Sequence, residues 1–297
     1  IVSNPDYIQH ILQKNNKNYH KSKVVKELLG SQLGQGLLTI DGDYWLKQRR
    51  LIQPGFYKQR LAELIGIMTN ETEDFCAELD LQIAQNPEAD VLKLMMHLTF
   101  RIVNKALFST GLQKEQLKRV DYIVTNLQKY VITMARQPYL YPWLKLTGKI
   151  KFYESLRRET DDIVYGIIKE RREQKSGYND LLDMLINSRY EDTGEGMNDK
   201  QLRDESMILI VAGHETSANA LAWALYLISQ RPDVEQKLLQ EAEAVLGNRT
   251  PTFEDLPNLQ YTRQVIQETM RLYPPAWIID RMALEDDEID GYKIPKD

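Results

Sequence analysis

The run at residues 212–217, Ala-Gly-His-Glu-Thr-Ser, places polar and backbone-loosening residues inside the most apolar helical stretch of the chain. Because no proline falls between Asn198 and Arg231, this stretch predicts one long buried helix capped by Asn198 or Asp199. A mid-helix glycine costs about 1 kcal/mol relative to alanine, and a threonine hydroxyl can bond back to the carbonyl one turn earlier. A local weakness in a buried helix indicates a position where chemistry is expected.

One face of this predicted helix carries mostly small side chains. The residues at helical spacing on it are Leu209, Ala212, Gly213, Thr216 and Ala220. Such a face would let a flat ligand lie against the helix backbone. It would equally suit a close crossing of two helices, with the threonine hydroxyl satisfied inside the core. The residues alone leave both interpretations open.

Trp45 and Arg49 form a second constellation, on a short predicted helix that Pro54 helps to end. Positions i and i+4 face the same way. An indole N–H and a guanidinium offer donors and no acceptor, so a pair aimed into the protein suits a carboxylate or a phosphate. The alternative is a cation–π contact between the two side chains at the surface.

Glu268 and Arg271 form a third constellation, one turn apart near the end of a helix that Tyr273 and Pro274 terminate. The two side chains can pair bidentately. If exposed, such a pair contributes little to stability; if buried, it would fix the local geometry.

Composition limits the class of protein. The chain has 297 residues, 42% of them hydrophobic, which is enough for one big domain or two smaller ones. Because no break in the sequence is long enough to be a domain linker, we expect a single domain over residues 1–297. A net charge of −5 without a dense basic block argues against nucleic-acid binding. No apolar run approaches the roughly 20 residues of a membrane helix, so we expect no membrane segment and a cytoplasmic location. The single cysteine, Cys76, excludes an internal disulfide and an all-cysteine metal site.

Helical periodicity dominates the remainder of the chain. Helix starts are predicted at Asn4-Pro5 and at Asn179-Asp180, and breaks at 31–42 and 137–148. Further helices are predicted near residues 57–79, 91–108 and 114–134. Short strands are predicted only within 285–295, around a turn at Asp290-Gly291.

Taken together, in this order and at these separations, the three constellations resemble the cytochrome P450 family of haem-thiolate monooxygenases. Trp45 and Arg49 resemble its Trp-x-x-x-Arg helix, residues 212–217 its oxygen-binding helix, and Glu268 with Arg271 its Glu-x-x-Arg helix. Residues 292–297 resemble the strand segment that follows. The resemblance covers essentially the whole chain and implies a mainly α cytochrome P450 fold, truncated at both ends, with a minor β region near the C-terminus.

The resemblance implies a haem cofactor, molecular oxygen, a lipophilic small-molecule substrate and an electron-donating reductase or ferredoxin. Glu215 and Thr216 would be catalytic, as a short relay of proton donors. The residues that would bind the haem are Trp45, Arg49, Ala212, Gly213 and Arg281. The residues that would contact the substrate are Leu37, Leu209, Ala276, Trp277 and Ile278, within a roof drawn from 33–38, 208–212 and 276–278. Glu268 and Arg271 would be structural, and His214 would be turned away from the Thr216 face.

One departure qualifies the resemblance. The sequence stops at Asp297, before the glycine-rich loop in which the family carries its cysteine ligand to iron, so no metal ligand is expected within these residues. Cys76 lies in an amphipathic helix, where a buried inert thiol is expected. We therefore expect an internal fragment of a longer enzyme, inactive by itself. The alternative is a non-catalytic helical binding or scaffold remnant that has lost the haem-ligand loop.

Overall fold

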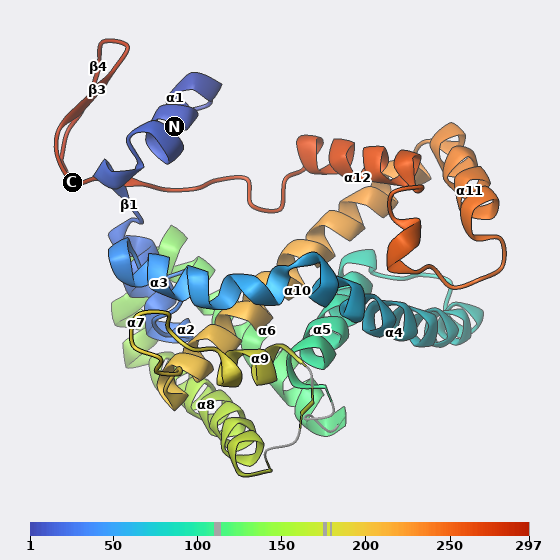
Figure 1. The fold of residues 1–297 in the computed structure, drawn as a ribbon, viewed down its shortest axis with the longest axis horizontal. Coiled ribbons are helices and arrows are strands. Elements are labelled where there is room, and N and C mark those ends of the chain that lie inside the picture. The colour runs from blue at the N-terminus through green and yellow to red at the C-terminus, as the bar shows by residue number, and fades with distance from the viewer. Residues whose placement is uncertain (110–113, 175–176, 179, 297) are drawn as a thin grey trace.

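A computed structural model describes residues 1–109, 114–174, 177–178 and 180–296 of the chain. Asn179, from one predicted helix start, and Asp297, at the end of the predicted strand segment, lie outside the described residues. The fold is mainly helical with a minor β region, as predicted (Figure 1).

The elements follow one another with short connections. The α-helices are α1 (Pro5–Gln9), α2 (Gly30–Leu33), α3 (Gly42–Ile52), α4 (Lys58–Gln85), α5 (Val91–Phe108), α6 (Lys114–Arg136), α7 (Tyr141–Leu146), α8 (Lys149–Gln174), α9 (Leu181–Asn187), α10 (Asp199–Ser229), α11 (Pro232–Leu246) and α12 (Gln260–Leu272). Shorter helical turns are η1 (His10–Lys14), η2 (Asn16–Asn18), η3 (Val24–Leu29), η4 (Gln53–Phe56), η5 (Pro138–Leu140) and η6 (Phe253–Asp255). The strands are β1 (Tyr19–His20), β2 (Met282–Ala283), β3 (Asp287–Ile289) and β4 (Tyr292–Ile294).

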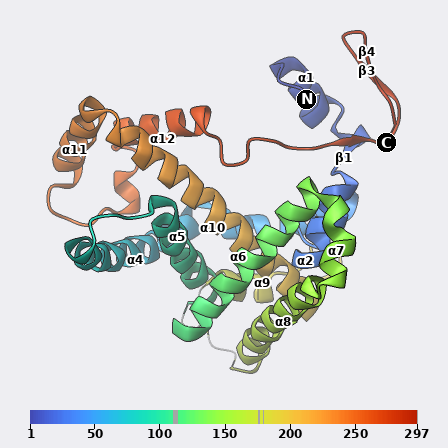
Figure 2. The same cartoon turned by 180° about the vertical axis from the view of Figure 1, so that it is seen from behind.

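Helix α10 is the central helix of the molecule and corresponds to the predicted long helix. Asn198 is its N-cap, and a capping box with Gln201 satisfies two backbone N–H groups that the helix itself cannot pair. Helices α5, α8 and α12 all pack on it (Figures 1 and 2). The first half of α10 is buried from Leu202 to Ile208, so the residues that follow it are held on a rigid support.

The main core lies around that buried half of α10. Its fully buried side chains come from α3, α5, α6, α8, α9 and α10 and include Ile52, Phe100, Phe108, Val124, Ile168, Leu182, Leu202 and Ile210. Burying an apolar side chain of this size contributes about 1.5–3 kcal/mol. These side chains fix the position of α10 relative to α5 and α8.

The β elements bring the two ends of the chain together. β1 pairs with β2 in antiparallel register, with Tyr19 opposite Ala283. β3 and β4 form the predicted hairpin, and Asp290 and Gly291 both adopt left-handed φ values, 51° and 83°, as a two-residue hairpin turn demands. The β1–β2 pairing was not predicted, because two-residue strands leave no periodic pattern.

The predicted break at 137–148 contains helical structure. Pro138 and Pro142 stand in the first turns of η5 and α7, where a missing backbone N–H is no loss. The two prolines begin helices here, where the sequence analysis had taken them as interruptions.

Candidate active site

The small side chains on this face of α10 are used in both of the ways that their spacing allows, as an open surface and as a close helix crossing. Ala212 and Thr216, one turn apart, are exposed on the same side of the helix. Gly213 lies against α5, where an added Cβ would come within 2.7 Å of Val103 Cγ2. The glycine is therefore required by a close helix crossing, and an open strip remains at Ala212 and Thr216. A cofactor role for Gly213 stays a prediction.

Thr216 makes the local bond that its position predicts. Its Oγ1 donates to the carbonyl oxygen of Ala212 at 2.6 Å. The hydroxyl oxygen keeps its lone pairs free to accept a proton from a neighbouring group on the exposed side. Thr216 can therefore hold and pass a proton at one fixed point of the strip.

His214 points away from this strip, as predicted, and is completely buried. Its ring meets Phe100 of α5 edge-on, with centroids 5.3 Å apart, and neither ring nitrogen has a hydrogen-bond partner. Burial lowers its pKa to about 4, so the ring is neutral at physiological pH. The histidine is part of the α5–α10 packing and is not available as a ligand.

Glu215 faces a different neighbour from Thr216. Its Oε2 accepts a hydrogen bond of 2.9 Å from Gln128 Nε2 on α6. Burial raises the pKa of the Glu215 carboxyl, which keeps its proton to a higher pH than an exposed glutamate would. This environment suits an acid. No hydrogen bond joins Glu215 to Thr216 among the described residues.

A mainly apolar cavity of about 140 Å³ lies beside Glu215, between α10, α6 and the segment before α3. Its lining residues are Leu29, Gln32, Leu33, Val124, Leu127, Gln128, Val131, Ile132, Met207, Val211 and Glu215. The predicted contacts Leu37 and Leu209 are absent from it, because both pack against the main core. Of the residues in the predicted roof, only Leu33 and Val211 line this cavity. Glu215, which lies outside the roof, lines it as well.

A cluster of donors surrounds the Trp45 ring on α3. Arg49 Cζ lies 5.3 Å from the ring centroid, and Lys21 Nζ lies 5.7 Å from it. Trp45 and Arg49 thus make the cation–π contact, which is one of the two arrangements that their spacing allows. Their donor groups lie at the same place. Burial lowers the pKa of Lys21 to about 8, Arg281 lowers it further, and Asp41 opposes both. The charge of Arg281 thus reaches Lys21 from the far end of the chain, and a role for Arg281 in haem binding stays a prediction.

The loop 34–41 connects this cluster to α10. Lys21 Nζ donates to the carbonyl oxygens of Leu37 at 2.7 Å and Ile40 at 2.6 Å. On the other side, the N–H of Leu37 donates to the carboxylate of Glu205 on α10, at 3.1 and 3.2 Å. Glu205 is buried, and burial raises its pKa to about 7. Direct contacts thus run from Trp45 through Lys21 and Leu37 to α10.

The segment after α12 does not meet the cavity. Trp277 and Ile278 are 70% and 55% exposed, in an extended stretch that runs from α12 toward β2 (Figure 1). Ala276 is exposed as well. Their role as substrate contacts stays a prediction, since within the described residues they line no pocket with α10.

Glu268 and Arg271 form the predicted bidentate pair, with two bonds of 2.7 Å. The pair is exposed, with 56% and 66% of the two side chains accessible. Solvent therefore screens both charges within the described residues, and the structural role of the pair stays a prediction.

Cys76 is exposed, which corrects the expectation of a buried thiol. The preceding residue, Phe75, takes the buried position on α4. Since successive helical residues point about 100° apart, Cys76 turns toward solvent. Within the described part of the chain, no three His, Cys, Asp or Glu side chains gather as a metal site.

Four residues of this region escaped the sequence analysis. Lys21 and Gln128 gave no signal, because each acts through a contact distant in sequence. Asp204 and Glu205 did give a signal in the sequence, because two adjacent carboxylates precede an apolar run. Glu205 also lies on the same helical stripe as Ala212 and Thr216.

The comparisons with known proteins agree with this arrangement. The family profile described as Cytochrome P450 matches residues 1–297. Cyclooctatin synthase of Streptomyces melanosporofaciens is 33% identical over 98% of this chain, and pentalenene oxygenase of Streptomyces avermitilis is 29% identical over all of it. The chain spans 62% and 64% of the lengths of these relatives.

A solved structure shows the same fold. The heme domain of cytochrome P450DA superposes with a TM-score of 0.82 at 22% identity, covering 99% of this chain and 62% of that one. No helix of the described residues is both long and apolar enough to span a membrane. From the profile match over all 297 residues and the relative at 33% identity, the chain belongs to the cytochrome P450 family.

Proposed function

We propose that the protein is a haem-dependent monooxygenase that inserts one atom of molecular oxygen into a lipophilic small molecule. The observation that carries the proposal is the series of contacts from the donor cluster at Trp45, through loop 34–41, to Glu205 of α10, the helix that carries the strip at Ala212 and Thr216. Haem, when bound, supplies the activation of molecular oxygen and its transfer to a carbon atom.

The residues present fit a haem. Its two carboxylates at one edge require donors, and the side chains of Trp45, Arg49, Lys21 and Arg281 supply donor groups that bond to no carboxylate among the hydrogen bonds of the described residues. Its flat apolar ring requires a flat, small-residue surface, which the exposed Ala212 offers. We assign propionate binding to Trp45, Arg49 and Arg281 as the sequence predicted, and add Lys21.

Proton delivery falls to Thr216 and Glu215. The Thr216 hydroxyl lies on the open strip, where it can hold a proton at a defined atom. Glu215, with its raised pKa and its bond from Gln128, is the neighbouring proton source. Because the two side chains are not bonded to each other, a water molecule or a rotation of Glu215 would have to complete the relay.

The apolar lining of the cavity supports a lipophilic substrate. Its polar side chains, Gln32, Gln128 and Glu215, are too few to hold a charged or highly hydroxylated molecule. Electrons would come from a reductase or a ferredoxin, as the family resemblance implies.

The test is the absorbance of the purified full-length protein after reduction under carbon monoxide. A Soret band of the thiolate-ligated type is expected, with one haem per chain. A full-length protein that takes up no haem would refute the proposal and favour a non-catalytic helical binding protein.

A further inference from the structure

Two neighbouring polar side chains stand in the mainly apolar cavity beside α10. Gln128 of α6 and Glu215 of α10 are both half-buried, and both line the cavity. They are joined by one hydrogen bond of 2.9 Å, from Gln128 Nε2 to Glu215 Oε2. Each side chain therefore keeps one oxygen, its Oε1, for which the described residues supply no donor.

These two oxygens suit the hydroxyl group of a ligand. Both accept hydrogen bonds, so an alcohol O–H can donate to either one. Burial raises the pKa of the Glu215 carboxyl, and in its protonated form that carboxyl can also donate to the oxygen of the alcohol. A hydrocarbon that displaces water from the same oxygens leaves them without a donor, which is unfavourable.

The remainder of the cavity is apolar and follows α10. Met207, Val211 and Glu215 are spaced four residues apart, so they lie on one stripe of the helix that is about 12 Å long. The polar residue stands at the downstream end of this stripe. Apolar cavities of about 150 Å³ bind molecules the size of benzene, and this cavity has a volume of about 140 Å³. Its shape therefore fits a compact hydrocarbon body with one polar group at the Glu215 end.

Gln32, the third polar side chain of the lining, is engaged elsewhere. Its Nε2 donates to Ser31 Oγ at 3.0 Å, and Ser31 Oγ donates to the carbonyl oxygen of Leu28 at 2.8 Å. Since the hydroxyl hydrogen of Ser31 is used, the amide must face Ser31 with its N–H group, which fixes its orientation. The Gln32 Oε1 is buried without a partner, so a molecule in the cavity does not reach it. Gln32 is thus a matched control for Gln128.

We infer that Gln128 is a specificity-determining residue that, together with Glu215, binds the hydroxyl group of a lipophilic alcohol, so that the substrate is a compact hydrocarbon already carrying one hydroxyl. The inference rests on the proposed function for taking the occupant of the cavity as the substrate. The preference for an alcohol rests on the geometry of the cavity alone.

Two ligands of equal shape test this assignment in the full-length protein. Benzyl alcohol and ethylbenzene differ by a hydroxyl group in place of a methyl group. The methyl NMR signal of Met207, identified by its loss in Met207→Leu, reports the binding of either ligand, because Met207 lines the cavity at its apolar end. The quantity measured is the ratio of the two dissociation constants.

Gln128→Met keeps the length of the side chain and removes its hydrogen-bonding atoms. We expect it to lower the preference for benzyl alcohol over ethylbenzene by about tenfold, as the loss of one good hydrogen bond in an apolar site does. Glu215→Met should give a similar loss, and the double variant should lose little more, because the two side chains act as one site. Gln32→Met should keep the original ratio. A purely structural role for Gln128 would weaken both ligands equally.

An unchanged ratio in Gln128→Met would overturn the inference, and so would an equal loss in Gln32→Met. A Met207 signal that neither ligand shifts would also overturn it, because the ligands would then not enter the cavity. A full-length protein that takes up no haem would refute the proposed function, while the ratio measured at Met207 would still decide whether the cavity selects an alcohol.

Discussion

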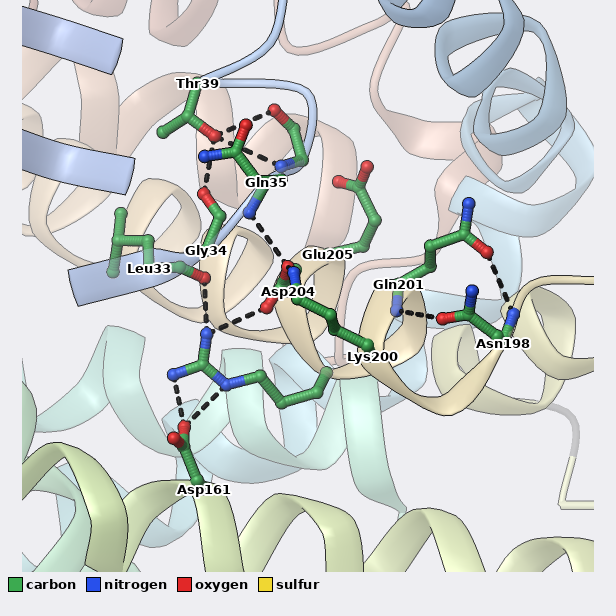
Figure 3. A network of polar contacts seen from close by, with 12 residues as sticks. Leu33, Gly34, Gln35, Thr39, Asp161, Asn198, Lys200, Gln201, Asp204 and Glu205 are labelled. Atoms are coloured by element: carbon green, nitrogen blue, oxygen red, sulfur yellow. Dashed lines mark hydrogen bonds and ion pairs between the residues drawn. The ribbon is translucent and has the colours of Figure 1, made fainter. Parts of the chain in front are cut away.

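Two arginine–carboxylate pairs in this chain have the same chemistry and opposite surroundings. Arg203, on α10, has a side chain that is 5% exposed; it bonds to Asp161 of α8 at 2.6 Å and to Asp204 at 2.9 Å, and it donates to the carbonyl oxygen of Leu33 (Figure 3). Arg271, on α12, bonds within the described residues only to Glu268 of its own helix and is 66% exposed.

The difference shows which kind of contact stabilises the described part of the chain. Arg203 joins three separate elements in a region that excludes water, so each of its partners would lose a counter-charge or a donor without it. Arg271 joins two residues already one turn apart. Bidentate geometry alone therefore says little about what a pair contributes, and the number of elements joined in a buried place says more.

The largest effect is expected from Arg203→Ala. The change leaves Asp204 with Lys200 as its remaining cation, beside the N–H of Gln35, and removes the Arg203 donor from two backbone carbonyls, so the free energy of unfolding should fall by about 3–5 kcal/mol. Urea unfolding measures this change. A loss no larger than that of an exposed arginine, with Arg60→Ala as the control, would contradict the importance given to the buried network.

The next effect concerns His214, a buried side chain whose ring nitrogens have no hydrogen-bond partner among the described residues. The pKa of His214 is about 4 in the folded state, against about 6.5 when unfolded, so the unfolded chain binds more protons between these values. His214 therefore costs no stability above pH 6.5 and lowers it as pH falls toward 4, by roughly 3 kcal/mol in total.

The comparison of urea midpoints at pH 7 and pH 4.5 measures this dependence. We expect the difference to shrink in His214→Leu, which cannot titrate. His97→Leu is the control on the neighbouring α5. An equal acid sensitivity in His214→Leu and the original protein would show that other groups govern the acid response.

A smaller effect on stability, with a large one on chemistry, is expected from Thr216→Ala. The side chain is exposed and alanine favours helices, so the unfolding midpoint should stay near its original value. In the haem-loaded full-length protein, more of the electrons consumed should appear as hydrogen peroxide, because the proton donor on the strip is gone. Ser217→Ala, one position further along α10, is the control. Unchanged yield of product per electron would remove Thr216 from the relay.

The smallest effect is expected from Arg271→Ala in the 297-residue chain. Both partners are exposed, so the urea midpoint should not change measurably. The same substitution in the full-length protein sharpens the comparison. A large loss of stability there, and none in this chain, would mean that residues outside it bury the pair.

Much of the fold followed from the sequence because the informative patterns are local. The start of α10 at Asn198, the bounds of α5 and the turn at Asp290-Gly291 each depend on a few neighbouring residues. The constellation at 212–217 located the exposed strip, and the spacing of Trp45 and Arg49 located the donor cluster, for the same reason.

The remainder depended on contacts that no local pattern records. Lys21 reaches the Trp45 ring across a loop, and Gln128 meets Glu215 from another helix. The exposure of Glu268 and Arg271 depends on what covers α12, which an i,i+3 spacing cannot report. Gly213 illustrates the limit most clearly, because its spacing fits a ligand face and a helix crossing equally well, and the crossing is recognised only from the approach of Val103.

The joining of the two ends of the chain has a consequence for the order of folding during synthesis. Tyr7 donates to Asp290, 283 positions later, and β1 has no strand partner other than β2 among the described residues. At about 5–20 residues per second, the ribosome makes the partner of β1 only after roughly 13–53 seconds. The α-helices between the two strands can assemble during that interval. The N-terminal segment is therefore the last part of this chain to reach its folded position, and the edge of β1 stays unpaired in the nascent protein until then.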